Sequence, residues 1–218
     1  MKKYELTGET KEIGGKILHR IRALVDIPVH NVKAGDLGGW IEAERNLSQK
    51  GAAWVADEAR VMDSARVTGK ALVMGSAWVT GSARVMGEAL VMDSARVTGK
   101  ALVTGKALVT DSARVTGKAL VMGSAWVTGS ARVTGKARVT DSADYITIGA
   151  IGSRNDTSTF YRGADEKIYV SCGCFNGSID DFASKVKAVH AGTKHEKTYL
   201  LAIELAKAQI ATEAENDG

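Results

Sequence analysis

One six-residue phrase constrains the fold of this chain more than any other feature. The phrase is repeated fifteen times without a break from residue 55 to residue 144. Every copy opens with Val and has Ala in the fifth place, and the sixth place holds Arg, Leu or Trp in all copies but the last. A period of six residues lacks the 3.6-residue rhythm of a helix, so the phrase predicts strands and turns.

Each copy divides into a short strand and a corner. In the strand, Ala and the next Val face inward, whereas the residue between them faces outward. The corner holds mainly Thr or Met, then Gly or Asp, then Ser or Lys. Gly and Asp tolerate the backbone angles of a tight corner. Short strands that always turn the same way predict a parallel coil with a core of Val and Ala.

The phrase resembles the hexapeptide repeat of the left-handed parallel β-helix, in which three strands and about eighteen residues make one turn. The hand is taken from this resemblance, because the general preference for crossovers is right-handed. The fifteen copies imply a mainly-β fold, a left-handed parallel β-helix of about five turns over residues 47–144. Residues 63–85 are identical to residues 111–133, which indicates that duplication explains part of the regularity.

The outward residues fall into three columns when they are sorted by this period. The apolar column contains Trp54, Leu72, Leu90, Leu108 and Trp126. The Arg column contains Arg60, Trp78, Arg96, Arg114 and Arg132. The mixed column contains Arg66, Arg84, Leu102, Leu120 and Arg138.

The apolar column and the Arg column are the candidate interfaces. Soluble monomers rarely expose a contiguous apolar stripe, so we expect this one to be covered. A second copy of the chain, the C-terminal helices or another protein could cover it, and self-association is favoured. Stacked Arg side chains repel each other, and either solvent or an anionic partner, a protein or a small host molecule, would screen them. Trp78 could stack on Arg96 or on a ligand ring. The alternative is that the Arg column only keeps the surface soluble.

Residues 1–46 are predicted to form a β-hairpin and a cap. Residues 3–7 and 15–27 have the pattern of two strands, and the only proline, Pro28, ends the second strand. Trp40 follows a glycine-rich turn and is expected to plug the open end of the coil, because such an end exposes apolar core and unpaired strand edges.

Residues 145–218 have the pattern of an α+β domain. Its predicted elements are a strand at 145–152, a hairpin of 157–162 and 167–175, a helix that Ser178 and Asp181 begin, and a second helix over about 196–211. The polar residues 213–218 are expected to form a disordered tail.

The N-terminal part of the coil carries a family resemblance. Val32-Lys-Ala-Gly-Asp-Leu-Gly-Gly-Trp-Ile41, followed by Asn46-Leu-Ser-Gln-Lys-Gly51 and Trp54, resembles the same region of the YdcK-like hexapeptide-repeat proteins. It is also similar to short proteins carried by bacteriophages and prophages. This resemblance implies a phage-borne origin and, as one role, inhibition of host defence. The YdcK-like proteins are labelled transferases, but the resemblance carries over no activity, and we expect no cofactor and no catalytic residue.

Charge and histidine placement weigh against other classes. Residues 52–144 hold 12 Lys and Arg against 8 Asp and Glu, which is too weak an excess to favour nucleic-acid binding. No apolar run has membrane-spanning length and no signal peptide is recognisable, so a cytoplasmic location in a bacterial host cell is expected. Hexapeptide-repeat acyltransferases use a histidine general base, but all four histidines lie outside residues 52–144.

The two cysteines allow a metal site in principle. Cys172 and Cys174 lie two apart on a predicted strand, and with His190 and His195 they could supply four zinc ligands. Two core thiols are the favoured reading, so we expect no metal. The sequence therefore predicts a non-enzymatic binding or scaffold protein. An acyltransferase-like enzyme and a weak nucleic-acid binder are the alternatives.

Overall fold

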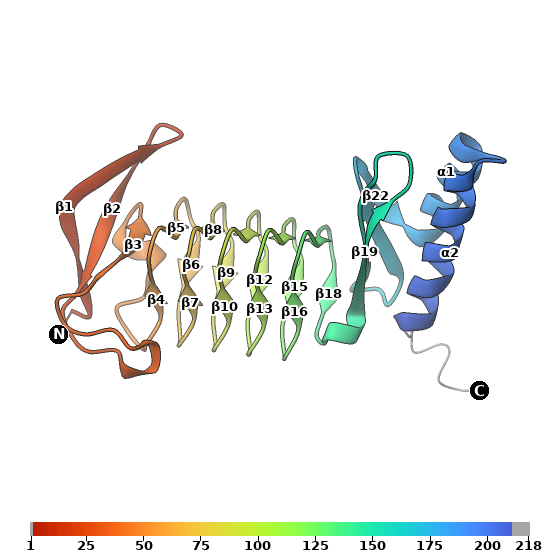
Figure 1. Cartoon of the computed structure of the whole chain (residues 1–218). Coiled ribbons are helices and arrows are strands. Elements are labelled where there is room, and N and C mark those ends of the chain that lie inside the picture. Colours follow the sequence, from red (N-terminus) through yellow and green to blue (C-terminus); the bar gives the residue numbers. More distant parts are fainter. Residues whose placement is uncertain (1, 211–218) are drawn as a thin grey trace.

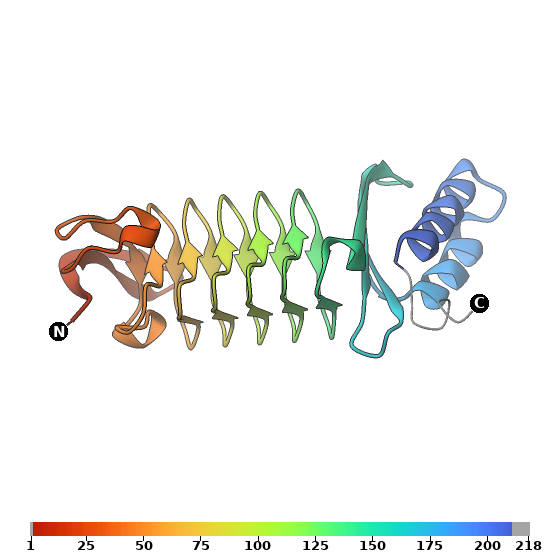
Figure 2. The same cartoon turned by 90° about the horizontal axis from the view of Figure 1, so that it is seen from below.

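The computed structural model describes residues 2–210, which form a rod with a different structure at each end (Figures 1 and 2). A β-hairpin lies at the N-terminal end, a parallel β-solenoid forms the middle, and an antiparallel sheet with two helices lies at the C-terminal end. The mainly-β solenoid prediction is confirmed, with about six turns where the repeat count gave five. The additional turn comes from residues before the first copy, because β3 (Leu37–Ile41) pairs with β5 (Arg60–Val61) and Leu47 bridges Val67. The left hand stays a prediction.

Fifteen two-residue strands build the solenoid. They are β4 (Trp54–Val55), β5 (Arg60–Val61), β6 (Arg66–Val67), β7 (Leu72–Val73), β8 (Trp78–Val79), β9 (Arg84–Val85), β10 (Leu90–Val91), β11 (Arg96–Val97), β12 (Leu102–Val103), β13 (Leu108–Val109), β14 (Arg114–Val115), β15 (Leu120–Val121), β16 (Trp126–Val127), β17 (Arg132–Val133) and β18 (Arg138–Val139). The sheets run β4-β7-β10-β13-β16, β5-β8-β11-β14-β17 and β6-β9-β12-β15-β18. The predicted eighteen-residue register is confirmed, since Arg96 pairs with Trp78 and with Arg114.

The core consists of the two inward residues of each copy. The Val residues at every sixth position from Val55 to Val139 are fully buried, and the Ala residues at every sixth position from Ala53 to Ala137 are at most 1% exposed. Ala143 departs from the pattern and is exposed, because the chain leaves the coil there in a short 3₁₀ turn, η3 (Ser142–Asp144). The identical small residues let successive turns stack directly, which explains why Val and Ala do not vary.

In the first fourteen copies the corner backbone at the third place is left-handed, which Gly and Asp tolerate, whereas Asp141 in the last copy has φ −139°. Gly105, for example, has φ +74°, and Asp57, Asp63 and Asp111 have φ between +52° and +59°. Each of these three carboxylates accepts the backbone N–H eighteen residues later, on Gly75, Gly81 and Gly129, at 2.9 Å. Asp therefore supplies an acceptor for an N–H of the next turn, and Gly supplies the conformation without strain.

The predicted N-terminal hairpin is confirmed, and ion pairs with Glu58 join it to the solenoid. β1 (Tyr4–Ile13) and β2 (Lys16–Ala23) are antiparallel, β2 pairs with β3, and short 3₁₀ turns follow at η1 (Pro28–His30) and η2 (Glu44–Asn46). Glu58 of the solenoid accepts hydrogen bonds from Lys11 Nζ at 2.9 Å, Arg20 Nη1 at 2.8 Å and Trp40 Nε1 at 3.1 Å. These donors, Lys11 foremost, lower the pKa of Glu58 to about 2.

The prediction that Trp40 plugs the coil is wrong. Trp40 lies on the outward side of β3, in register with Arg60, and packs with Leu18 and Met62 under the hairpin. Its neighbours Gly39 and Ile41 face inward, and a Cβ on Gly39 would lie 2.7 Å from Val55 Cγ1. The end of the core is closed by hairpin residues instead, among them the buried Tyr4 and Ile21.

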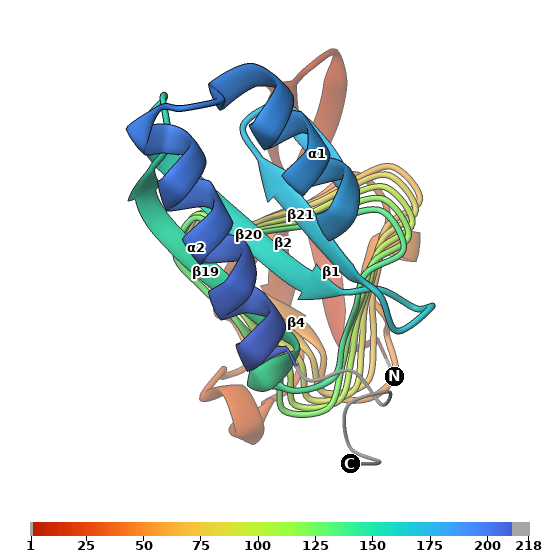
Figure 3. The same cartoon turned by 90° about the vertical axis from the view of Figure 1, so that its right-hand side faces the viewer.

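The C-terminal part contains an antiparallel sheet with two helices on one face (Figures 1 and 3). The strands, in sheet order, are β19 (Tyr145–Ile151), β20 (Asp156–Arg162), β21 (Ile168–Cys172) and β22 (Phe175–Ser178), and the helices are α1 (Ile179–His190) and α2 (Lys194–Gln209). The predicted strand at 167–175 is wrong in extent, since a turn with Gly173 at φ +57° divides it into β21 and β22. The helix start at Ser178 is confirmed, because its hydroxyl accepts the N–H of Asp181 at 3.1 Å. The predicted tail at 213–218 lies outside the described residues.

Strand β20 closes the C-terminal end of the solenoid. The N–H of Arg132 donates to Thr159 Oγ1 at 2.9 Å, and Tyr161, 1% exposed, belongs to the same apolar cluster as the solenoid core. Beside this contact, the buried Asp144 accepts hydrogen bonds from Thr140 and forms an ion pair of 3.0 Å with Arg162. Burial alone would raise the pKa of Asp144, but these donors hold it below its usual value. Both ends of the core are thus covered by β-structure.

Candidate functional site

The Arg column forms one continuous outward surface on the sheet β5-β8-β11-β14-β17. Its residues pair in register from Arg60 through Trp78, Arg96 and Arg114 to Arg132. Arg96 and Arg114 are exposed, whereas the other members are partly buried. The sheet spacing places successive side chains about 4.8 Å apart, so neighbouring guanidinium groups lie within repulsive range.

Trp78 separates the cations at the N-terminal end of the column. The guanidinium carbon of Arg60 lies 5.6 Å from the centre of the Trp78 ring, and that of Arg96 lies 5.3 Å from it. Both distances fit a cation–π contact, so the predicted stacking of Trp78 on Arg96 is confirmed. The Trp78 Nε1–H is buried without a hydrogen-bond partner in the structure.

The C-terminal end of the column carries successive cations without compensation. No ion pair joins Arg60, Arg96, Arg114 or Arg132 to an acidic side chain in the described part of the chain. Arg132 is steadied by a hydrogen bond of 3.2 Å from its Nη1 to the carbonyl of Gly173. The solenoid can therefore offer Arg96 and Arg114 to an external acid.

A groove of about 260 Å³ lies where the Arg column meets the turn between β21 and β22. Its solenoid wall is formed by Arg114, Arg132 and nearby threonines, and its other wall includes Ser171 and Asn176. Guanidinium, hydroxyl and amide groups are suited to carboxylate or phosphate oxygens. The groove makes this end of the column a candidate site for an anionic group.

The apolar column is in register but is not uniformly exposed. Trp54 is 1% exposed, because the hairpin side of the molecule covers it: Gly38 fits between Trp54 and Ile21 so closely that a Cβ there would meet both at 2.6 Å. Leu72, Leu90 and Leu108 are partly buried. Trp126, at the far end, is 58% exposed.

The alternative in which the C-terminal helices cover the apolar column is wrong. Helix α2 contacts β19 and helix α1 contacts β21 and β22, so both pack on the C-terminal sheet (Figures 1 and 3). The helices therefore lie beyond the end of the solenoid and do not cover the apolar column.

The cysteines do not share a strand. Cys172 ends β21 and is partly buried, whereas Cys174 lies in the following turn and is exposed. The expectation of two core thiols is therefore wrong for Cys174. The rings of His190 and His195 are 5.9 Å apart. Within residues 2–210, no group of three or more His, Cys, Asp or Glu side chains is placed to hold a metal ion.

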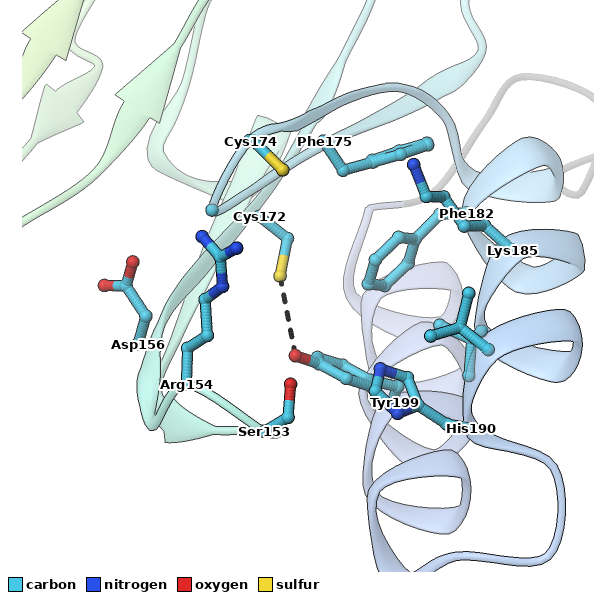
Figure 4. Close-up of a pocket in the computed structure, with 13 residues that line it drawn as sticks. Ser153, Arg154, Asp156, Cys172, Cys174, Phe175, Phe182, Lys185, His190 and Tyr199 are labelled. Carbon is cyan, nitrogen blue, oxygen red and sulfur yellow. Dashed lines mark hydrogen bonds between the residues drawn. The ribbon is translucent and has the colours of Figure 1, made fainter.

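A cavity of about 230 Å³ between the C-terminal sheet and its helices is a feature that sequence reasoning missed (Figure 4). The Tyr199 hydroxyl lies 3.9 Å from Cys172 Sγ, and the Ser158 hydroxyl donates to the same sulfur at 3.1 Å. Burial, followed by the nearby Cys172, raises the pKa of Tyr199, so its hydroxyl remains a donor at neutral pH. The one residue in the sequence that hints at this packing is Gly152, because a Cβ at this position would collide with the Tyr199 hydroxyl.

Comparisons with known proteins add no family assignment. No protein-family model matches the chain, and no curated protein is significantly similar to it. The resemblance to YdcK-like and phage-borne repeat proteins therefore stays a prediction. No helix in the described part of the chain is long and apolar enough to cross a membrane.

Proposed function

We propose that this protein is a non-enzymatic binding protein whose Arg column takes an acidic segment of a partner protein. The single observation that carries the proposal is the in-register stack of Arg96, Arg114 and Arg132, none of which forms an ion pair with an acidic side chain among residues 2–210. Like charges that face each other across strands cost roughly 0.2–1 kcal/mol per pair. Carboxylates from a partner would remove this repulsion and form charge-assisted hydrogen bonds.

The same sheet shows how this chain treats cations that it satisfies internally. At the hairpin junction, Lys11 and Arg20 share the carboxylate of Glu58. Among residues 2–210, no acidic side chain pairs with Arg96, Arg114 or Arg132 as Glu58 pairs with Lys11 and Arg20. This contrast supports an external acidic group as the missing partner.

An acidic peptide tests the proposal directly. Binding of fluorescently labelled hexaglutamate is measured by anisotropy for the full chain and for Arg96→Gln and Arg114→Gln. We expect each substitution to weaken binding about threefold to tenfold, because one guanidinium contact is lost. Arg66→Gln and Arg84→Gln are matched controls, since these side chains also stand in register on a solenoid sheet but belong to the mixed column.

Two results would overturn the proposal. The first is an equal loss of affinity in the Arg96→Gln variant and the Arg66→Gln control, which would indicate net charge alone. The second is tight binding of a single-stranded oligonucleotide with no binding of hexaglutamate, which would favour the nucleic-acid alternative.

Self-association through the apolar column is the second part of this proposal. Exposed Trp126 with the partly buried Leu108 and Leu90 gives a continuous apolar strip on one sheet. We expect a mass above that of one 23.0 kDa chain in light scattering, and a return to that mass in Trp126→Ser. A monomeric wild-type protein would refute this part.

An acyltransferase is the enzymatic alternative, and a binding assay with acetyl-CoA distinguishes it from the non-enzymatic binding protein. Such an enzyme should bind acetyl-CoA in a cleft that holds a histidine. The absence of histidine from residues 52–144 favours the non-enzymatic proposal. The phage-borne origin and the role against host defence rest on the resemblance of the N-terminal segment alone, and they make a soluble bacterial protein the partner to seek.

A further inference from the structure

The C-terminal cavity has an aromatic and aliphatic wall that fits one small ring (Figure 4). The ring centres of Phe175 and Phe182 are 5.1 Å apart, and those of Phe182 and Tyr199 are 5.4 Å apart in an edge-on arrangement. Val186 and Val189 complete this wall. A cavity of about 150 Å³ can hold benzene, so the 230 Å³ here suits a single ring with one substituent.

Cationic side chains reach the same cavity from different elements. Lys185 of α1 holds its Nζ 5.6 Å from the centre of the Phe175 ring. Arg154, in the turn before β20, places Nη1 3.7 Å from the position that a Cβ on Gly173 would occupy. No ion pair joins either cation to an acidic side chain among residues 2–210.

One acidic residue, Asp156, also lines the cavity, and its position matters. Its Oδ1 accepts the N–H of Thr157 at 2.7 Å. In Figure 4 its carboxylate lies on the opposite side of Arg154 from Tyr199. The other residues that line the cavity include the cations Arg154 and Lys185 and the Tyr199 hydroxyl, all of which can donate a hydrogen bond to an anion.

We propose that this cavity binds a small molecule with one aromatic ring and one anionic group, a carboxylate or a phosphate. The ring packs against Phe175, Phe182 and Val189, which remove its apolar surface from water. The anion lies between Arg154 and Lys185, and the Tyr199 hydroxyl donates a hydrogen bond to it. The Arg column takes no part in this site, so the inference stands independently of the proposed function.

Calorimetric titration of the full chain tests the proposal with named probes. Phenyl phosphate and benzoate are compared with benzyl alcohol, which has the ring without the charge. We expect at least one anion to bind more tightly than benzyl alcohol by about tenfold or more, and the tighter anion identifies the phosphate or carboxylate class.

Matched variants of helix α1 locate the site. Lys185→Met should weaken binding of the preferred anion about tenfold, and Arg154→Gln should do the same. Lys187→Met should leave binding unchanged, because Lys187 stands on the same helix but does not line the cavity. Circular dichroism of each variant confirms that the helices remain folded.

Three outcomes would overturn the inference. One is equal binding of benzyl alcohol and both anions, which would remove the role of charge. Another is an equal effect of Lys185→Met and Lys187→Met. The last is the absence of binding by all three probes at concentrations up to about 1 mM, a weakness that corresponds to only about −4 kcal/mol.

Discussion

A substitution at Gly105 probes how one turn of the solenoid constrains the next. Gly105 has φ +74°, and a Cβ added there would lie 2.8 Å from the backbone nitrogen of Gly123 and 2.9 Å from its oxygen. An L-residue in left-handed conformation costs roughly 1–2 kcal/mol. Relief of the backbone contact adds roughly 1–2 kcal/mol, as in other overpacked positions. Gly105→Ala should therefore lower the free energy of unfolding by about 2–4 kcal/mol.

The chain provides controls that separate these two costs. Gly129 and Gly135 have φ of +63° and +67°, but a Cβ at either position would meet nothing within 4 Å. Gly129→Ala and Gly135→Ala should lower the free energy of unfolding only by the conformational cost, about 1–2 kcal/mol. Gly105→Asp should lower the free energy of unfolding by about 1 kcal/mol less than Gly105→Ala does. The reason is that the new carboxylate can accept the N–H of Gly123, as Asp111 accepts the N–H of Gly129.

Urea unfolding followed by tryptophan fluorescence measures these differences, provided that the slope m is unchanged among the variants. Equal losses in Gly105→Ala and in both controls would refute the role of the next turn. A Gly105→Asp variant as unstable as Gly105→Ala would refute the role of the carboxylate.

The junctions at the two ends of the solenoid give further predictions. Glu58→Gln should cost about 1 kcal/mol after allowance for solvent screening. Because the pKa of Glu58 is lowered to about 2, this contribution is present above its ordinary value of 4.5 and is lost as the pH falls toward 2, so wild type and variant should converge in acid urea titrations. Tyr161→Ala should cost about 3–5 kcal/mol and speed amide exchange in the last turns, since it removes the aromatic residue that closes the core; unchanged exchange there would contradict this. Asp144→Ala should cost about 1–3 kcal/mol, because it removes the carboxylate that accepts from Thr140 and pairs with Arg162, while Glu166 still pairs with Arg162 at 3.1 Å; thermal unfolding checks it. A loss below about 0.5 kcal/mol would contradict the importance of this carboxylate.

The solenoid was predictable because its information is local and periodic. Inward Val and Ala recur every six residues, and three strands per turn then place Arg96 beside Trp78 and Arg114 without further assumptions. The Gly or Asp preference at the corner was likewise readable from backbone conformation. Its second cause, the hydrogen bond that the N–H of Gly75 donates to the Asp57 carboxylate one turn away, required the three-dimensional register.

The end structures were less predictable because they depend on contacts distant in sequence. Trp54 looked like an exposed member of the apolar column, but Ile21 and Gly38 of the hairpin side bury it. Trp40 looked like a core plug, but the alternation along β3 turns it outward. The strand predicted through Cys174 ignored Gly173, whose positive φ ends β21.

The candidate sites divide in the same way. The Arg column follows from the repeat, since every member stands at a fixed place in its copy. The C-terminal cavity does not, because Arg154, Lys185 and Tyr199 line one cavity only after the helices pack on the sheet. Gly152 was the one local hint, and its reason is visible only beside Tyr199.

The salt dependence of hexaglutamate binding tests the central proposal most directly. It compares the wild-type chain with the Arg96→Gln/Arg114→Gln double variant and with the Arg66→Gln/Arg84→Gln double control, from about 0.05 to 0.5 M salt. The wild type and the control should show Kd values that rise steeply with salt, and the Arg96→Gln/Arg114→Gln variant should bind weakly at every concentration. A steep salt dependence that survives in this variant, at wild-type affinity, would contradict binding of an acidic partner by the Arg column.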